Sequence, residues 1–291
     1  MKKAVWLLFL GLLANLPVRA DVTVLVHGYL GSDRSWVDSG VIAALQDHGH
    51  VLRGTWHPSP QGPVYFPLDK GPGRPLYTVL LPSLAPIVVQ ADWLAAYLQE
   101  IHHRHPRDAI TLVGHSAGGV VARMTLVRHR PAGVQRLITI AAPHLGTWRA
   151  LQALDAVDDD WPPPLQQIRR WEVRRRLGDP LYHTLRASRG VLQDLVPARP
   201  GTLLYWLNQQ PHPDIEYIAL IRGRTLRLPG DRLVPPFSQD MRQVPAIGTR
   251  ARAYTTPPGH RLGPHDGRVL AALLASPAVR RPVTPITSRT R

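Results

Sequence analysis

Apolar residues along this chain follow two periods, one typical of buried strands and one typical of helices. Short β-branched and aliphatic runs predict strands at 22–26, 51–56, 76–81, 110–113, 136–141, 215–221 and 251–255. Helical spacing predicts helices over 36–45, from Pro86 to about 101, over 117–127 and over 266–275. Strands that are apolar on both faces and alternate with helices favour an α/β fold with a mostly parallel, doubly wound sheet.

Two segments interrupt this alternation. Residues 57–75 are rich in proline and glycine, which predicts a long surface loop. Residues 148–213 carry several tryptophans and a run of three prolines at 162–164, and we interpret them as an inserted cap. The chain from 21 to 275 is therefore predicted to be one domain with a cap insertion, and 276–291 to be a disordered tail.

The first 20 residues have the three parts of a secretory signal peptide. Lys2 and Lys3 precede an apolar run over 4–13, and Val18-Arg19-Ala20 resembles a cleavage site. The apolar run is shorter than the roughly 20 residues that a membrane span needs. We therefore expect export, with the mature protein periplasmic or secreted.

The amino-acid composition excludes several kinds of catalysis and indicates the charge of possible partners. The chain has 0 cysteines, which excludes thiol catalysis, cysteine-bound zinc and disulfides. Its formal charge of +15 falls to +12 when Lys2, Lys3 and Arg19 leave with the signal peptide. Arginines at 169–170 and 174–176 fit either a solvated helix face or peripheral contact with an anionic membrane surface. No nucleic-acid motif accompanies them, so no nucleic-acid partner is expected.

The sequence Gly114-His115-Ser116-Ala117-Gly118 joins the strand at 110–113 to the helix at 117–127. This Gly-x-Ser-x-Gly turn is the signature of a nucleophile elbow, in which a strained backbone pushes the serine hydroxyl outward. The two glycines allow the strand and the helix to pass closely. The alternative is a serine that only caps the helix. We predict that Ser116 is a nucleophile.

A serine nucleophile needs a histidine base and an acid that orients it, and in this fold the order along the chain is Ser, acid, His. Asp231 follows the strand at 215–221 in a Gly-Asp turn, whereas Asp194 lies in the cap and Asp214 precedes its strand. The alternative for Asp231 is an ordinary Asx-turn. We predict Asp231 as the acid.

The base is predicted to be His260, in the loop between the last strand and the last helix. His265 is the competitor, but it lies beside the helix start, where Asp266 is the expected N-cap. The trio His102, His103 and His105 at a helix end does not share one face, which disfavours a metal site. We expect the chemistry to require neither a metal nor an organic cofactor, while a structural calcium leaves no signal in the sequence.

The oxyanion that forms on serine attack needs backbone donors. Ala117 supplies one N–H because it follows the nucleophile, and the loop after the first strand supplies another, which we assign to Tyr29. His27 is predicted to brace this loop. Its alternative is an ordinary buried histidine.

These segments together resemble the α/β-hydrolase superfamily, as carried by His27-Gly28-Tyr29, the Ser116 elbow, Ala142-Pro143-His144-Leu145-Gly146-Thr147, Gly230-Asp231 and Gly259-His260. The chain is similar to secreted bacterial lipases and esterases and to inositol-deacylase-like proteins. The resemblance implies an esterase or lipase with Ser116, Asp231 and His260 in the site, and a lid over the acyl pocket at 148–213. The arginine-rich cap favours a soluble ester over a lipid ester, because lids that face lipid are usually apolar.

The sequence therefore predicts an exported serine hydrolase that cleaves a small-molecule or lipid carboxylic ester through an acyl-enzyme. Acyl transfer, or cleavage of amides or thioesters, would use the same groups and stays an alternative. A non-catalytic periplasmic binding protein on a hydrolase fold is the second alternative. Acyl chain length and oligomeric state leave no signal in the sequence.

Overall fold

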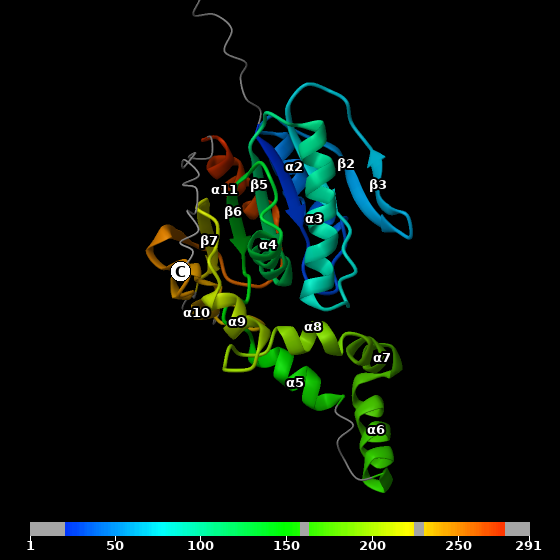
Figure 1. Cartoon of the computed structure of the whole chain (residues 1–291). Coiled ribbons are helices and arrows are strands. Elements are labelled where there is room, and N and C mark those ends of the chain that lie inside the picture. The colour runs from blue at the N-terminus through cyan, green and yellow to red at the C-terminus, as the bar shows by residue number, and fades with distance from the viewer. Residues whose placement is uncertain (1–20, 158–162, 224–229, 277–291) are drawn as a thin grey trace, which may run out of the picture.

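The computed structural model of the protein describes residues 21–157, 163–223 and 230–276. Within these ranges the strands form one eight-stranded sheet in the order β3-β2-β4-β1-β5-β6-β7-β8 (Figure 1). The strands are β1 (Val22–Val26), β2 (His50–Ser59), β3 (Gly62–Pro67), β4 (Arg74–Val79), β5 (Ile110–His115), β6 (Val134–Ile140), β7 (Glu216–Arg222) and β8 (Ala251–Thr256). All neighbouring pairs are parallel except β2 and β3, which confirms the predicted sheet class.

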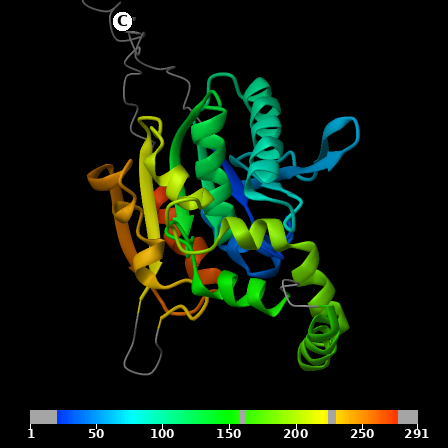
Figure 2. The same ribbon diagram turned by 60° about the horizontal axis from the view of Figure 1, so that its bottom comes forward.

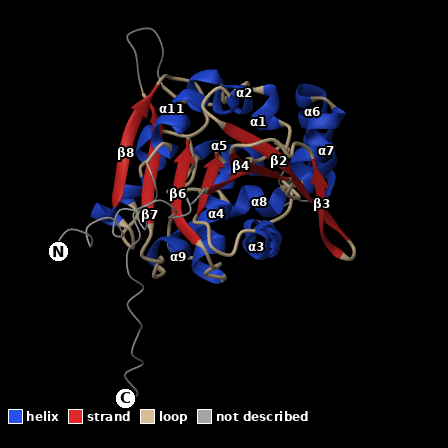
Figure 3. Cartoon of the chain, turned by 90° about the horizontal axis from the view of Figure 1, so that it is seen from above, coloured by secondary structure: helices blue, strands red, loops and turns tan. Residues whose placement is uncertain are grey.

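Helices cover both faces of the sheet (Figure 3). Side chains alternate along β1, so that Val24 packs into a core with α3 (Ile87–Arg104) and α4 (Ala117–Arg128). Leu25 packs into a second core on the opposite face, with α1 (Ser35–Asp38), α2 (Val41–Gln46) and α11 (Pro264–Leu274). Burial on both faces explains why the central strands are apolar at every position. The carboxyl ends of the parallel strands thus meet at one edge.

Two predictions about local structure were wrong. The helix expected over 36–45 is broken into α1 and α2, because Gly40 lies between them with a φ of 75°. The loop expected over 57–75 begins instead with a β-hairpin, in which Pro58 pairs with Pro63. Proline donates no ladder hydrogen bond, but this loss is tolerated where a strand has a free side. Pro63 is in the edge strand β3, and Pro58 lies beyond Trp56, the last β2 residue that pairs with β4.

The N-cap prediction for the last helix was also wrong. The helix α11 begins at Pro264, with Gly263 as N-cap, and Asp266 is the third residue of its first turn. The Asp266 Oδ2 atom accepts the Gly263 N–H at 2.9 Å, so the carboxylate still satisfies the helix start. Asp266 also forms a buried ion pair with Arg222, which ties the helix to the end of β7.

The segment between β6 and β7 is helical in the parts that the structure describes. It contains α5 (Trp148–Ala156), α6 (Pro163–Leu177), α7 (Asp179–Ala187), α8 (Arg189–Asp194) and α9 (Leu203–Gln209). These helices lie at the carboxyl edge of the sheet, and α6 projects away from it (Figures 1 and 2). The remaining short helices are α10 (Pro236–Gln239), η1 (Met241–Gln243) and η2 (Gly248–Arg250).

The signal peptide expected at 1–20 and the tail expected from 276 lie outside the described residues, except for Ser276. No helix within the described ranges is both long enough and apolar enough to cross a bilayer.

Candidate active site

Ser116 lies between the end of β5 and the start of α4, with φ 53° and ψ −129°. Non-glycine residues rarely adopt a positive φ, and such strain is concentrated at functional sites. The side chain does not cap α4, so the alternative that Ser116 is only a helix cap is wrong. The turn instead presents the hydroxyl to the loops at the carboxyl edge.

Glycines make this turn sterically feasible. A Cβ atom on Gly114 would lie 2.6 Å from the Gly119 Cα atom, and one on Gly118 would lie 2.3 Å from the His27 carbonyl oxygen. Both distances are shorter than real Cβ contacts, and the second neighbour is backbone that cannot rotate away. The close passage inferred from the sequence is therefore present, and Gly118 also brings the β1 loop against the elbow.

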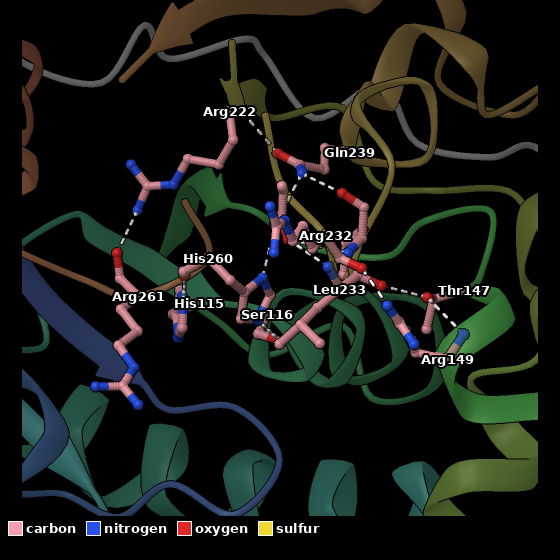
Figure 4. Close-up of polar contacts among 12 residues, drawn as sticks. His115, Ser116, Thr147, Arg149, Arg222, Arg232, Leu233, Gln239, His260 and Arg261 are labelled. Carbon is pink, nitrogen blue, oxygen red and sulfur yellow. Dashed lines mark hydrogen bonds and ion pairs between the residues drawn. The ribbon is translucent and has the colours of Figure 1, made fainter. Parts of the chain in front are cut away.

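The structure places the predicted base within hydrogen-bond distance of both the predicted nucleophile and the predicted acid. Figure 4 shows His260 beside Ser116. The Ser116 Oγ atom lies 2.9 Å from His260 Nε2, and the His260 Nδ1 atom lies 2.7 Å from Asp231 Oδ2. Because a carboxylate only accepts hydrogen bonds, Nδ1 carries the ring proton and donates it to Asp231. His260 Nε2 is then a lone-pair acceptor for the serine hydroxyl, which is the arrangement a general base requires.

Asp231 is buried, with a side-chain exposure of 0%, and four donors surround it. Its Oδ1 atom accepts the backbone N–H groups of Leu233 at 2.8 Å and Val234 at 3.1 Å. Burial by itself would raise the pKa of Asp231, but the hydrogen bonds from His260 and from these amides outweigh it and lower the pKa. The carboxyl group is therefore ionised at neutral pH.

Two residues that the sequence analysis missed hold the acid and the base in place. The Gln239 Nε2 atom donates to Asp231 Oδ2 at 3.1 Å and to the Val234 carbonyl at 2.7 Å. The His115 Nε2 atom donates to the carbonyl of His260 at 2.8 Å. Burial, and then the neighbouring His260, lower the pKa of His115 to about 3, so its ring stays neutral.

Arg222 links the segments that hold the acid and the base in place, and no sequence pattern indicated its role. Its guanidinium donates to both oxygens of Asp266 and to the carbonyl of Arg261, next to His260. Its backbone N–H donates to Gln239 Oε1 at 2.8 Å. The loop that carries His260 and the helix that carries Gln239 are thus both tied to the end of β7 (Figure 4).

The β1 loop lies directly over the nucleophile. A Cβ atom on Gly28 would lie 2.8 Å from the Ser116 Cβ atom, which only glycine avoids. His27 is fully enclosed and braces the loop, because its Nε2 atom accepts the Leu81 N–H at 3.0 Å while Nδ1 donates to the Gly28 carbonyl. Burial lowers the pKa of His27, in keeping with a neutral ring. The Tyr29 hydroxyl is bonded to Ser188 Oγ at 2.7 Å.

The backbone next to both predicted oxyanion donors lies close to the nucleophile. Ala117 is the first residue of α4, and the N–H groups of a first helical turn have no partner within the helix. The Gly28 Cβ position would lie 3.4 Å from the Ala117 nitrogen, so the Gly28-Tyr29 peptide runs beside that amide. The N-terminus of α4 adds a partial positive charge at this point.

The other acids and histidines considered from the sequence lie elsewhere. Asp194 accepts the Ile87 N–H at 2.7 Å, and Asp214 is exposed near Arg250. His265 is exposed on the first turn of α11. His105 bonds Tyr77 and Asp108 rather than a neighbouring histidine. Within the described ranges, no cluster of three or more His, Asp or Glu residues is placed to hold a metal ion.

The sequence around Ser116 is similar to sequences of known proteins. Residues 87–160, which contain Ser116, match the PGAP1-like alpha/beta domain family. Over 67 residues the chain is 36% identical to GPI inositol-deacylase B of Yarrowia lipolytica. That match covers 19% of this chain and 7% of the yeast protein.

Solved structures with the same fold cover most of the chain. The mature lipase BlEst2 of Bacillus licheniformis is 18% identical with a TM-score of 0.56, over 89% of this chain and 93% of that one. The RedJ thioesterase of the prodiginine pathway in Streptomyces coelicolor is 20% identical with a TM-score of 0.52, over 89% and 86%. The chain therefore has the α/β-hydrolase fold, and the segment around its serine elbow is similar to the PGAP1-like alpha/beta domain.

Proposed function

We propose that the protein is a serine hydrolase that cleaves carboxylic esters through an acyl-enzyme. The observation that carries the proposal is the continuous chain of hydrogen bonds from Ser116 through His260 to Asp231. A PGAP1-like segment and lipase and thioesterase neighbours with the same fold support it.

The reaction begins when Ser116 Oγ attacks the ester carbonyl carbon and its proton passes to His260 Nε2. The electron pair of the carbonyl moves onto oxygen, and the N–H groups of Tyr29 and Ala117 donate to this oxyanion. When the oxyanion collapses, the bond to the alkoxide breaks, and His260 returns the proton to the leaving alcohol. Asp231 stabilises the imidazolium between the two transfers.

Water completes the cycle. His260 takes a proton from the water as its oxygen attacks the acyl carbon, and the same base then returns a proton to Ser116 Oγ as the acid product leaves. Replacing the water by an alcohol or amine gives acyl transfer with the same groups. A panel of acyl donors, assayed with and without an alcohol acceptor, distinguishes ester hydrolysis from transfer and from thioester or amide cleavage.

A groove of about 580 Å³ next to the β1 loop is the proposed acyl site. Its lining is largely apolar and comes from Pro82–Pro86, Ala187 and Gly190. Ser188, between the last two residues, holds the Tyr29 hydroxyl, so the groove and the oxyanion loop are neighbours. We therefore expect Ala187→Trp to lower kcat/KM for longer acyl chains more than for acetate. Equal loss for all chain lengths would place the acyl group elsewhere.

Replacement of Ser116 by alanine tests the function itself. We expect Ser116→Ala to lose turnover of p-nitrophenyl esters and labelling by a fluorophosphonate probe, which reacts only with an activated serine. Retained turnover would refute the role of Ser116. A wild-type protein that neither turns over esters nor reacts with the probe would instead support the alternative of a binding protein. Export to the periplasm or medium remains part of the proposal and is checked by cell fractionation.

A further inference from the structure

The helix α6 stands apart from the sheet and packs against α7 (Figures 1 and 2). It extends beyond the carboxyl ends of the strands (Figure 1), and Ser116 follows one of these ends, that of β5. We call its exposed residues Ile168, Trp171, Arg174, Arg175 and Arg176 the basic arm. One side of such a helix packs against the rest of the protein, and the opposite side is exposed.

The basic arm exposes large apolar side chains. Ile168 and Trp171 are each 62% exposed, and their spacing of three places them on one face of the helix. Exposed aromatic and aliphatic side chains that adjoin each other mark interaction sites more often than scattered ones do. Tryptophan in particular prefers an environment that is apolar at one end and wet at the other.

Cations surround this apolar pair. The Arg175 guanidinium lies 5.4 Å from the centroid of the Trp171 ring, and further arginines line shallow grooves on either side of the ring. Arg174 pairs with Asp179 and Arg176 with Glu172, but these two acids leave the three arginines of the arm with a net positive charge. Guanidinium groups match the geometry of phosphate oxygens, and they retain their charge at any physiological pH.

A second set of exposed apolar side chains lies on loops at the site edge of the sheet. The loop after β1 contributes Leu30, which is 55% exposed, and α5 begins with Trp148, which is 60% exposed. Leu233 and Phe237, on the segment after β7, are 47% and 59% exposed. The Thr147 hydroxyl donates to the Leu233 carbonyl, which joins two of these segments (Figure 4). We call these four residues the apolar rim.

We propose that the basic arm docks on an anionic phospholipid bilayer, with Trp171 and Ile168 at the level of the headgroups and the arginines on the lipid phosphates. Charge complementarity and the adjoining apolar pair favour a bilayer over a folded partner, because one projecting helix presents less area than a stable protein interface needs. Docking brings the membrane close to the carboxyl edge of the sheet, where the loops that carry the apolar rim lie. Access of a lipid ester to Ser116 would follow, instead of the soluble ester that the arginine-rich cap led us to expect from the sequence, and that consequence alone rests on the proposed function.

Flotation with lipid vesicles tests the docking directly. The full chain is incubated with vesicles of phosphatidylglycerol and phosphatidylcholine in equal parts, and separately with pure phosphatidylcholine. We expect binding to the anionic vesicles that weakens as salt increases, because exposed charges are screened. Replacing Arg174, Arg175 and Arg176 by glutamine should lower the partition coefficient about 100-fold, since each arginine near the surface contributes roughly a factor of 5.

A matched variant controls for net charge. Lys70, Arg130 and Arg268 are exposed cations outside the basic arm, and replacing all three by glutamine removes the same formal charge. This variant should bind vesicles within a few-fold of the wild type. Trp171→Ala should also reduce binding, by about tenfold, even though it leaves the charge unchanged. Circular dichroism establishes that each variant is folded.

Several results would overturn the docking. Equal losses in the arm variant and the matched variant would show attraction by net charge alone, and equal binding to both kinds of vesicle would exclude recognition of lipid phosphate. Vesicle-independent binding to DNA that the arm variant loses would assign the arm to nucleic acid. Binding is measured in the Ser116→Ala protein as well. Because this variant cannot hydrolyse esters, its vesicle binding tests docking independently of the proposed hydrolysis.

Discussion

Replacing Asp231 by asparagine exchanges one carboxylate oxygen of the buried acid for an amide NH2 group. That group donates hydrogen bonds, whereas the oxygen it replaces accepts them. An asparagine oxygen can still accept the two amides of Leu233 and Val234, which lie 2.8 and 3.1 Å from the present Oδ1. Its amide nitrogen then faces His260 Nδ1 and Gln239 Nε2, and both of these groups are donors in the native protein.

The mismatch is resolved most readily if His260 moves its proton from Nδ1 to Nε2. In that tautomer Nε2 points an N–H at Ser116 Oγ, 2.9 Å away, and cannot accept the serine proton. The same change in a serine protease lowers kcat about 10⁴-fold. This factor corresponds to about 5.4 kcal/mol of transition-state stabilisation. We expect a loss of this size in kcat, with a much smaller change in KM.

The assay is steady-state hydrolysis of p-nitrophenyl butyrate, with the rate of fluorophosphonate labelling as an independent measure of serine activation. Asp194→Asn is the matched control. Like Asp231, Asp194 accepts a backbone N–H, in this case that of Ile87 at 2.7 Å, but it has no contact with His260. Its kcat should stay within about twofold. The reasoning is refuted if Asp231→Asn keeps a tenth of the wild-type kcat, or if Asp194→Asn loses as much.

Three further predictions concern the surroundings of the site. Tyr29→Phe keeps the backbone N–H but removes the hydroxyl that bonds Ser188 at 2.7 Å, so kcat should fall up to about fivefold, the equivalent of one hydrogen bond. Ser188→Ala should produce the same loss and the double variant no more, whereas additive losses would show that the two groups act separately. Gly118→Ala would place a Cβ atom 2.3 Å from the His27 carbonyl oxygen, and urea denaturation should show a loss of about 3 kcal/mol or no folding at all. An alanine variant of wild-type stability would contradict the close passage. Burial, followed by the charge of a nearby arginine, lowers the pKa of His212 to about 3 in the folded state. Because the unfolded chain binds this proton below about pH 6.5, the free energy of unfolding should decrease as the pH falls from 6.5 toward 3, by up to about 1.4 kcal/mol per pH unit for this group. His212→Gln should reduce the measured slope by one proton, and an unchanged slope would exclude the role of this histidine.

The strand and helix periods determined the class of fold. Buried parallel strands need apolar side chains on both faces, so each strand of the sheet except β3 was visible as a short aliphatic or β-branched run. The strand β3 was not visible, because its prolines are typical of a loop. They fit into a strand only because the pairing with β2 leaves β3 at the edge of the sheet.

The identity of the candidate acid and base followed from chain order, but their supports did not. Ser116 comes directly after β5, and Asp231 and His260 lie in the segments that follow β7 and β8. Parallel strands end at one edge, so convergence was expected. His115 belongs to the elbow motif and could have been singled out there. Gln239 and Arg222 carried no such signal, because their roles depend on contacts with residues distant along the chain.

The sequence by itself determined the sheet class, the strained elbow and the excess of arginine, because periodicity, glycine placement and charge are properties of the chain. Only the tertiary structure decided that Arg222 ties the His260 loop to Asp266, that Gly40 divides a predicted helix, and that α6 turns its arginines and Trp171 outward. Each of these outcomes depends on which distant segments pack together, and local sequence does not specify that packing.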